Sequence, residues 1–207
     1  MGPVRQYPGQ DMVTLLDQLR QACQDLTGRS IRASAESSQW RARLAITHSS
    51  PITNDLALAY NEHATQDAAY WRRLRHQWAC RYTATAVSIL RTTRTPGSPD
   101  APPPPAPDSG GQNWATDTTL TYPTLPDPTD LSTRSPSDDA RIAQAHQAVI
   151  EAADAAGMLD DLDGPADTPA EITQAAGQLT DCLLTYATAV HAATRNRLTP
   201  PVNGPHL

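Results

Sequence analysis

The 207-residue sequence contains no lysine and no phenylalanine, so all sixteen of its basic residues are arginine. Alanine, threonine, proline and aspartate are abundant instead. This skew is typical of chains encoded by a GC-rich genome, such as that of an actinomycete. Because arginine is the only strong base in the chain, a high arginine content is not by itself evidence of nucleic-acid binding.

Paired cysteines are missing as well. Cys23, Cys80 and Cys182 are odd in number, far apart in the sequence and without a C-x-x-C spacing. A disulfide framework is therefore not expected, and a reduced, cytoplasmic protein is the natural interpretation. The first residues contain no apolar signal region. The longest uncharged and fairly apolar run, residues 182–194, is too short to span a bilayer, so no membrane partner is expected.

Motifs that carry chemistry are also few. The sequence has no phosphate-binding glycine loop, no nucleophile elbow and no Glu-x-x-His pair of the kind that holds two metals in a helical bundle. Glu62, His63 and Asp67 lie close together, but no matching set stands on another predicted helix. His76 and Cys80 are one turn apart beside cations, which can lower the pKa of a thiol, yet no third group is identifiable to orient the imidazole. We expect no enzymatic activity, catalytic residue, cofactor or metal.

Helical periodicity dominates the first part of the chain. Apolar and small residues recur at alternating spacings of three and four, a heptad pattern that predicts one helix over about residues 10–48. Gly28 lies inside this helix and costs about 1 kcal/mol relative to alanine, but the register continues through it. The predicted inward positions are Leu16, Leu19, Cys23, Leu26, Ser30, Ala33, Ser37, Trp40, Leu44 and Thr47.

A second long helix is predicted from Pro51 to about Arg94. Ser50 suits the N-cap, Pro51 suits the first helical position, and the following T-P-G-S-P ends the helix. Trp71 and Trp78 lie at the centre of one apolar stripe, while most of the neighbouring arginines fall on other faces. Because nucleic-acid stacking needs aromatic rings exposed beside cations, we interpret both tryptophans as core residues. The full predicted stripe is Leu56, Tyr60, Ala64, Asp67, Trp71, Leu74, Trp78, Tyr82, Ala86 and Ile89.

Residues 96–136 are rich in proline, threonine, serine and aspartate, and they offer little apolar area to offset the entropy of ordering a chain. We expect a disordered linker with extended polyproline segments. Its sparse bulky residues are a candidate docking motif, which would either bind a partner or cover the protein's own helices. These residues are Trp114, Leu120, Tyr122 and Leu125, with Leu131 beyond them.

Residues 137–207 are predicted to form an acidic helical hairpin with a loose C-terminal tail. Its first helix would begin after Ser137 as N-cap and stop at Gly157. Its second would begin at Pro169, with Thr168 and Glu171 as a capping box, and run to about Arg197.

The predicted fold is therefore all-α, with a long N-terminal and a shorter C-terminal antiparallel hairpin packed as an elongated four-helix bundle. Residues 1–95 carry twelve arginines against seven acidic residues, a net charge of +5, and residues 96–207 carry four against fifteen, a net −11. These opposite charges favour docking of the two hairpins. The longer hairpin should extend beyond the shorter one and leave a surface for a partner, a second copy or the linker.

The function most consistent with this pattern is a non-catalytic helical interaction or scaffold protein, which would bind an unidentified protein partner or itself. One alternative is a nucleic-acid-binding or regulatory protein that uses an arginine face on the long hairpin, made of Arg41, Arg43, Arg72, Arg73 and Arg75. Another is a helical bundle that binds a small molecule. A convergence of these arginines on one patch would favour nucleic-acid binding, and a closed polar cavity would favour small-molecule binding.

Overall fold

The computed structural model describes residues 8–46, 51–93, 123–131, 133, 135–160 and 169–198. Within these ranges the structure is helical, and it contains no strand. The elements in chain order are α1 (Pro8–Ile46), α2 (Pro51–Thr92), the 3-10 helix η1 (Pro128–Leu131), α3 (Pro136–Asp160) and α4 (Pro169–Leu198).

Each of the four described α-helices begins with a proline: Pro8, Pro51, Pro136 and Pro169. Proline suits the first helical position because its fixed φ is already helical and because an amide hydrogen there would lack an intrahelical acceptor. The predicted starts at Pro51 and Pro169 are confirmed. The α3 prediction is wrong in detail, because Ser135 rather than Ser137 caps the helix, accepting from the Asp138 amide at 3.3 Å. The helix also continues through Gly157 to Asp160.

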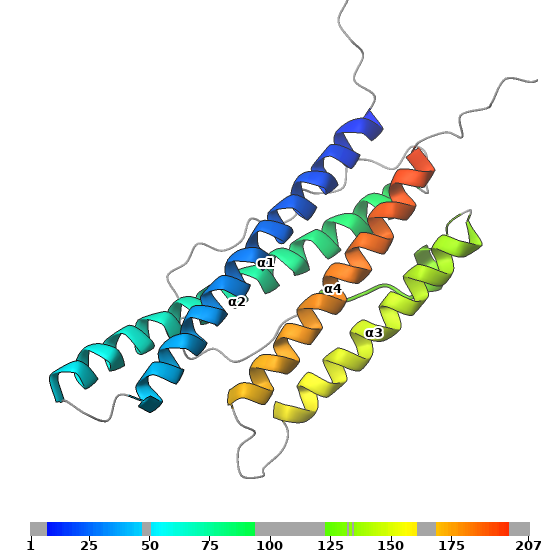
Figure 1. The fold of residues 1–207 in the computed structure, drawn as a ribbon. Coiled ribbons are helices and arrows are strands. Elements are labelled where there is room, and N and C mark those ends of the chain that lie inside the picture. The colour runs from blue at the N-terminus through cyan, green and yellow to red at the C-terminus, as the bar shows by residue number, and fades with distance from the viewer. Residues whose placement is uncertain are drawn as a thin grey trace, which may run out of the picture.

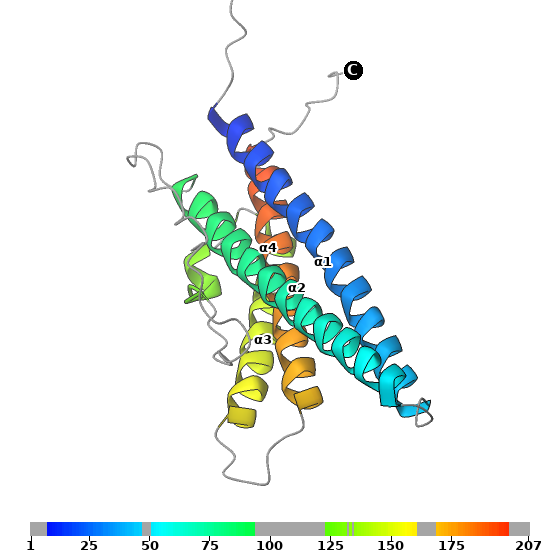
Figure 2. The same ribbon diagram turned by 90° about the vertical axis from the view of Figure 1, so that its left-hand side faces the viewer.

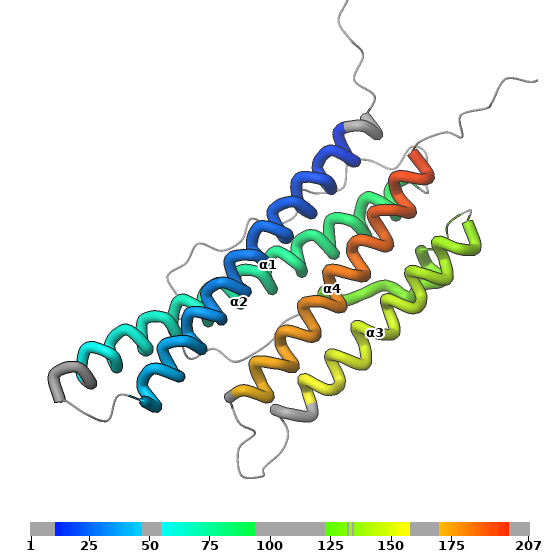
Figure 3. Tube along the Cα trace, viewed as in Figure 1, coloured from blue at the N-terminus to red at the C-terminus, as the bar shows by residue number. Residues whose placement is uncertain are grey.

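The chain descends along α1, ascends along α2, descends along α3 and ascends along α4 (Figures 1 and 3). α1 packs on α2, and α3 packs on α4, so the two predicted antiparallel hairpins form one four-helix bundle. α4 is the central helix of this arrangement, since it contacts α2 on one side and α3 on the other. Among the described elements, α2 and α3 are not direct neighbours.

The core lies where α4 meets the upper parts of α1 and α2. Its fully buried side chains come from all four described α-helices and include Leu16, Tyr82, Val149, Leu183 and Tyr186. The heptad positions predicted for the first helix are buried from Leu16 to Ser37. α1 is continuous through Gly28, as predicted, and a Cβ at this position would meet no atom within 4 Å.

Part of the predicted linker is packed structure rather than disordered chain. Leu131 in η1 is only 2% exposed and belongs to the core, and Leu125 packs against the same core from the half-buried segment before η1. Asp127 organises the turn, because its Oδ1 accepts from the Thr129 amide at 2.8 Å. η1 contacts both α2 and α3, so it fills the space between two helices that do not meet.

The two hairpins cross at an angle rather than lying parallel (Figure 2). As a result, the lower ends of α1 and α2 stand apart from the lower ends of α3 and α4 (Figure 1). The single stripe predicted for the second helix is therefore partly wrong. In the upper half, His76, Thr83 and Val87 are also buried, because α2 faces α4 as well as α1. In the lower half, Leu56 and Tyr60 are exposed.

Candidate interaction surface

The lower part of the long hairpin, residues 29–46 of α1 with residues 55–72 of α2, is called here the distal hairpin. The two helices approach each other there over small side chains, in contrast to the bulky core above. The buried residues of the distal hairpin are Ser30, Ala33, Ser37, Ala57, Ala64 and Ala68. Small side chains bury little apolar area, so this region contributes less to folding than the upper bundle.

Large apolar side chains gather on the outside of the distal hairpin. It carries six of the eight exposed large hydrophobic residues of the described chain, including Ile46, which is 80% exposed, and Leu56, which is 60% exposed. A single exposed apolar residue is ordinary, whereas a concentration in one region marks an interaction surface. The other four are Ile31, Leu58, Tyr60 and Tyr70.

The end of the distal hairpin also carries an ordered aromatic stack. The rings of Trp40 and Tyr60 lie 4.9 Å apart at an interplanar angle of 11°, so α1 and α2 are joined by a face-to-face contact. The guanidinium of Arg43 covers the Trp40 ring at 4.8 Å from its centroid. Cation–π contacts of this type stabilise by about 0.5–1 kcal/mol at exposed sites. This stack presents an amphipathic, fairly rigid surface.

Trp71 and Trp78 are half-buried, so their predicted burial is overstated, although Trp78 packs against the core. The Arg29 guanidinium lies 5.0 Å from the Trp71 ring centroid, and the Arg81 guanidinium lies 5.2 Å from that of Trp78. These two cations lie outside the predicted placement of most neighbouring arginines on other faces, because Arg81 borders the stripe and Arg29 belongs to α1. Arginine from α1 can reach Trp71 because the two helices pack closely, which the pattern of α2 alone does not reveal.

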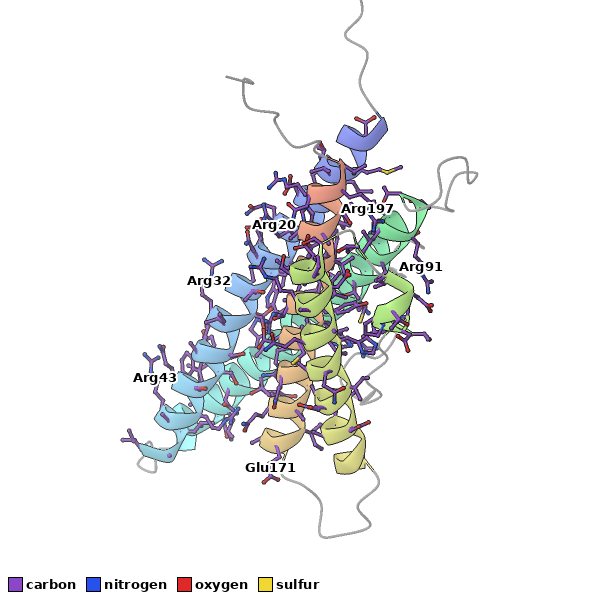
Figure 4. The ribbon with its side chains drawn as sticks, turned by 90° about the vertical axis from the view of Figure 1, so that its right-hand side faces the viewer. Arg20, Arg32, Arg43, Arg91, Glu171 and Arg197 are labelled. Carbon is purple, nitrogen blue, oxygen red and sulfur yellow. The ribbon has the colours of Figure 1, made fainter. Side chains whose placement is uncertain are left out.

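The five arginines of the predicted nucleic-acid face do not form one patch. Burial lowers the pKa of Arg72, and the positive charge of Arg41 lowers it further, so these two guanidinium groups influence each other. Arg43 instead projects from α1 on the side away from α3 and α4, as Arg32 does (Figure 4). Arg73 follows Arg72 but lies about 100° further round the helix.

Arg75 belongs to the contact between the hairpins. Its Nε donates to Thr27 Oγ1 at 3.0 Å, and its Nη2 forms an ion pair with Asp181 of α4. One arginine therefore links α1, α2 and α4. Its side chain is mostly buried, so it is not part of an open basic face.

Leu125, the described member of the predicted docking motif, lies on the protein's own bundle. Together with Pro123 and Thr124 it lines one side of an open pocket of about 270 Å³. Six residues of α2, among them Arg91, line the other side. Trp114, Leu120 and Tyr122 lie outside the described residues. The pocket lies on the outside of the bundle, not between its helices.

Cys80 and His76, the thiol and imidazole noted in the sequence, lie close together in the structure. Cys80 Sγ lies 3.6 Å from His76 Nε2, and His76 Nδ1 lies 2.9 Å from Thr180 Oγ1 of α4. Burial raises the pKa of Cys80 to about 12, so the thiol is protonated at neutral pH, contrary to the lowered pKa considered from the sequence. Within the described part of the chain, no group of three or more His, Cys, Asp or Glu residues is placed to hold a metal ion.

A second polar cluster was not predicted from the sequence. Tyr82 Oη lies 2.8 Å from His191 Nδ1, and His191 Nε2 lies 3.8 Å from Asp17 Oδ1. Arg20 and Arg195 flank this carboxylate at 3.0 and 3.5 Å. The cluster joins α1, α2 and α4 at the top of the bundle. The partners are far apart in sequence, so no local pattern signals the contact.

No protein-family model, curated protein or solved structure matches this chain. The functional conclusion therefore depends on the described surface alone.

Proposed function

We propose that this chain is a non-catalytic helical protein that binds a protein partner through the distal hairpin. The observation that carries the proposal is the concentration of exposed bulky side chains on a part of the bundle that the second hairpin does not cover. Ile46, Leu56 and Tyr60 expose apolar area beside the Trp40–Tyr60 stack. Each square ångström of apolar area removed from water contributes about 25 cal/mol, so covering this surface favours association.

The composition of the surface agrees with a protein partner. Interface centres are enriched in tryptophan, tyrosine and arginine, which are the residue types of the Arg43–Trp40–Tyr60 stack. A stacked, arginine-covered ring pair loses little side-chain freedom on binding, which lowers the entropic cost of association. The upper bundle supplies the rigid support for this surface.

Nucleic-acid binding is the second candidate, and it is favoured by the positive charge of Arg41 acting on Arg72, whose pKa is lowered first by burial and then by this charge. Several observations weigh against it. The chain carries a net charge of −6, Arg75 is occupied by Asp181, and arginines already cover the ring faces of Trp40, Trp71 and Trp78. Affinity for nucleic acid depends on many phosphate contacts, and base stacking needs free aromatic faces.

We place the proposed activity in the cytoplasm, supported by three cysteines that form no disulfide. In the described residues, no helix combines the length and the apolar character that a membrane crossing requires.

The proposal is tested by affinity capture from a lysate of the encoding organism, quantified by mass spectrometry. The wild-type chain is compared with an Ile46→Asp/Leu56→Asp variant and with Ile150→Asp, a control that places a charge at an exposed apolar position of α3. We expect the double variant to lose specific partners that the control retains, with both folded by circular dichroism. Retention of every specific partner by the double variant would contradict the proposal.

A further inference from the structure

The open pocket between α2 and the segment before η1 has a size and a chemistry that suit a small ligand. Six residues of α2 line one side, and Pro123, Thr124 and Leu125 line the other, around a volume of about 270 Å³. About nine water molecules occupy such a volume in the liquid. A ligand of about the same number of non-hydrogen atoms would therefore fill the pocket.

One part of the pocket wall is apolar and firmly held. Val87 is 8% exposed and belongs to the core, and Leu125 packs against the same core. Ala84 adds a methyl group to this wall. Because core contacts fix these side chains, a ring or short hydrocarbon chain can be covered there without rearrangement of the bundle.

Arg91 brings an uncompensated positive charge to the pocket. It projects from the upper end of α2 on the side where η1 lies (Figure 4). Its side chain is exposed, and among the described residues no carboxylate forms an ion pair with it. The Oδ1 atom of Asp127, the acid that follows the lining segment, is engaged by the Thr129 amide at 2.8 Å and hydroxyl at 2.6 Å. The charge of Arg91 also acts on Tyr186, but burial raises the pKa of that phenol to about 12, so it is neutral at pH 7.

Both walls of the pocket also carry hydrogen-bond donors that lack a protein acceptor in the described part of the chain. On α2, the hydroxyls of Thr83 and Thr92 donate to carbonyl groups of their own helix, whereas the hydroxyl of Ser88 makes no such bond. On the other wall, the amides of Thr124 and Leu125 make no hydrogen bond to a described backbone group. Together with a guanidinium, which presents a fork of N–H groups, these donors suit a carboxylate.

The pocket lies near the C-terminal end of α2, where the partial negative charge of a helix disfavours an anion. The last carbonyl groups of α2 are already engaged, however. Ile89 O accepts from the Thr93 amide at 3.0 Å. Leu90 O accepts from Arg197 Nη1 at 3.0 Å, so a second arginine offsets the charge of this helix end. Arg91 is not needed for that purpose.

We propose that this pocket binds a small carboxylate with a compact apolar body, such as an aromatic or short aliphatic acid. The carboxylate pairs with Arg91 and accepts from Ser88, and the apolar body lies against Val87 and Leu125. A phosphate would leave the apolar wall uncovered, and a neutral ligand would leave Arg91 without an anion. The inference goes beyond the proposed function, because the pocket lies on the upper bundle and not on the distal hairpin.

The test is a titration of the full chain with benzoate and with benzamide, which match in size and differ in charge. Binding is followed through the backbone amide resonances in two-dimensional NMR spectra. We expect benzoate to bind with a dissociation constant of about 1 mM, about tenfold more tightly than benzamide. The resonances of Ser88, Arg91 and Leu125 should shift on binding.

Three variants separate the charge of the pocket from its shape. Arg91→Gln should weaken the binding of benzoate about tenfold and leave that of benzamide unchanged, because it removes the charge alone. Arg32→Gln, the matched control, removes another exposed arginine on a different side of the bundle and should bind benzoate as the wild type does (Figure 4). Ser88→Leu should prevent the binding of both compounds, because the larger side chain fills the pocket. Circular dichroism confirms that each variant is folded.

Several outcomes would overturn the proposal. Equal affinity of the wild type for the two compounds would show that Arg91 does not recognise the carboxylate. Equal losses of benzoate binding in Arg91→Gln and Arg32→Gln would show unspecific attraction to arginine. Shifts confined to residues outside the pocket, or no binding of benzoate well above the expected dissociation constant, would reject the site itself. Each of these results would leave the capture of a protein partner by the distal hairpin unaffected, so the two proposals fail separately.

Discussion

Tyr82 and His191 are 109 positions apart in the sequence, yet their side chains meet inside the bundle at 2.8 Å. His191 is 3% exposed, and its Nε2 faces Asp17 without reaching hydrogen-bonding distance. Burial lowers the pKa of His191, the Asp17 carboxylate raises it, and Arg20 and Arg195 lower it again. Burial is the largest of these effects, so the imidazole is neutral in the folded protein near pH 7.

This environment predicts a loss of stability in mild acid. The imidazole of the unfolded chain has a pKa near 6.5, above that of folded His191, so the unfolded state binds the proton more readily. The stabilising contribution of neutral His191 is complete above pH 6.5 and decreases as the pH falls towards the folded pKa. We expect the urea midpoint of the wild type to decrease more between pH 7 and pH 5 than that of His191→Gln. Equal pH dependence of the two proteins would show that His191 does not titrate in this range.

Residue-level predictions from the sequence succeeded along the upper part of α1 and failed for polar side chains that contact the other hairpin. The heptad positions of α1 could be identified because their burial follows from local spacing alone. His76, Thr83 and His191 are buried through hydrogen bonds to another hairpin. Likewise, the contacts of Arg75 with Thr27 and Asp181 depend on the axial alignment of α1, α2 and α4, which a helical-phase argument on one helix does not determine.

At the level of elements, the four helices were predictable because periodicity marks their extent, and because Pro51 and Pro169 mark two of their starts. The segment from residue 123 to residue 131 was not, because its composition indicates disorder. Its order comes from the space between α2 and α3, where Leu131 has core neighbours on both sides. Tertiary packing thus overrides the local preference for an open chain.

The role of this segment is tested by comparing Leu131→Ala with Leu125→Ala. Both substitutions remove the same atoms, but Leu131 is fully buried whereas Leu125 is half-buried. We expect Leu131→Ala to lower the free energy of unfolding by about 2–5 kcal/mol, and Leu125→Ala by less than half of that. Chemical denaturation measures both. A loss below about 1 kcal/mol for Leu131→Ala would mean that η1 does not complete the bundle.

At the scale of the whole molecule, opposite net charges and a shared core both favour association of the hairpins. The contact between α2 and α4 buries Tyr82, Leu183 and Val190. Its ion pair, Arg75–Asp181, includes an aspartate that is 65% exposed. Exposed pairs contribute little and are screened by salt, whereas buried apolar area is not screened. Burial should therefore supply most of the free energy, with charge guiding the encounter.

Because apolar burial should outweigh charge, we predict that the two hairpins stay associated when the chain is divided between them. Residues 1–95 and 123–207, expressed as separate chains, should form a complex that survives size-exclusion chromatography at both low and high salt. Leu183→Asp should prevent its formation, because it places a charge in the shared core. Separation at low salt would show that the two hairpins are independent domains and do not form one four-helix bundle. Separation only at high salt would show that charge holds them together, in which case an acidic partner would compete directly with the second hairpin for the long one.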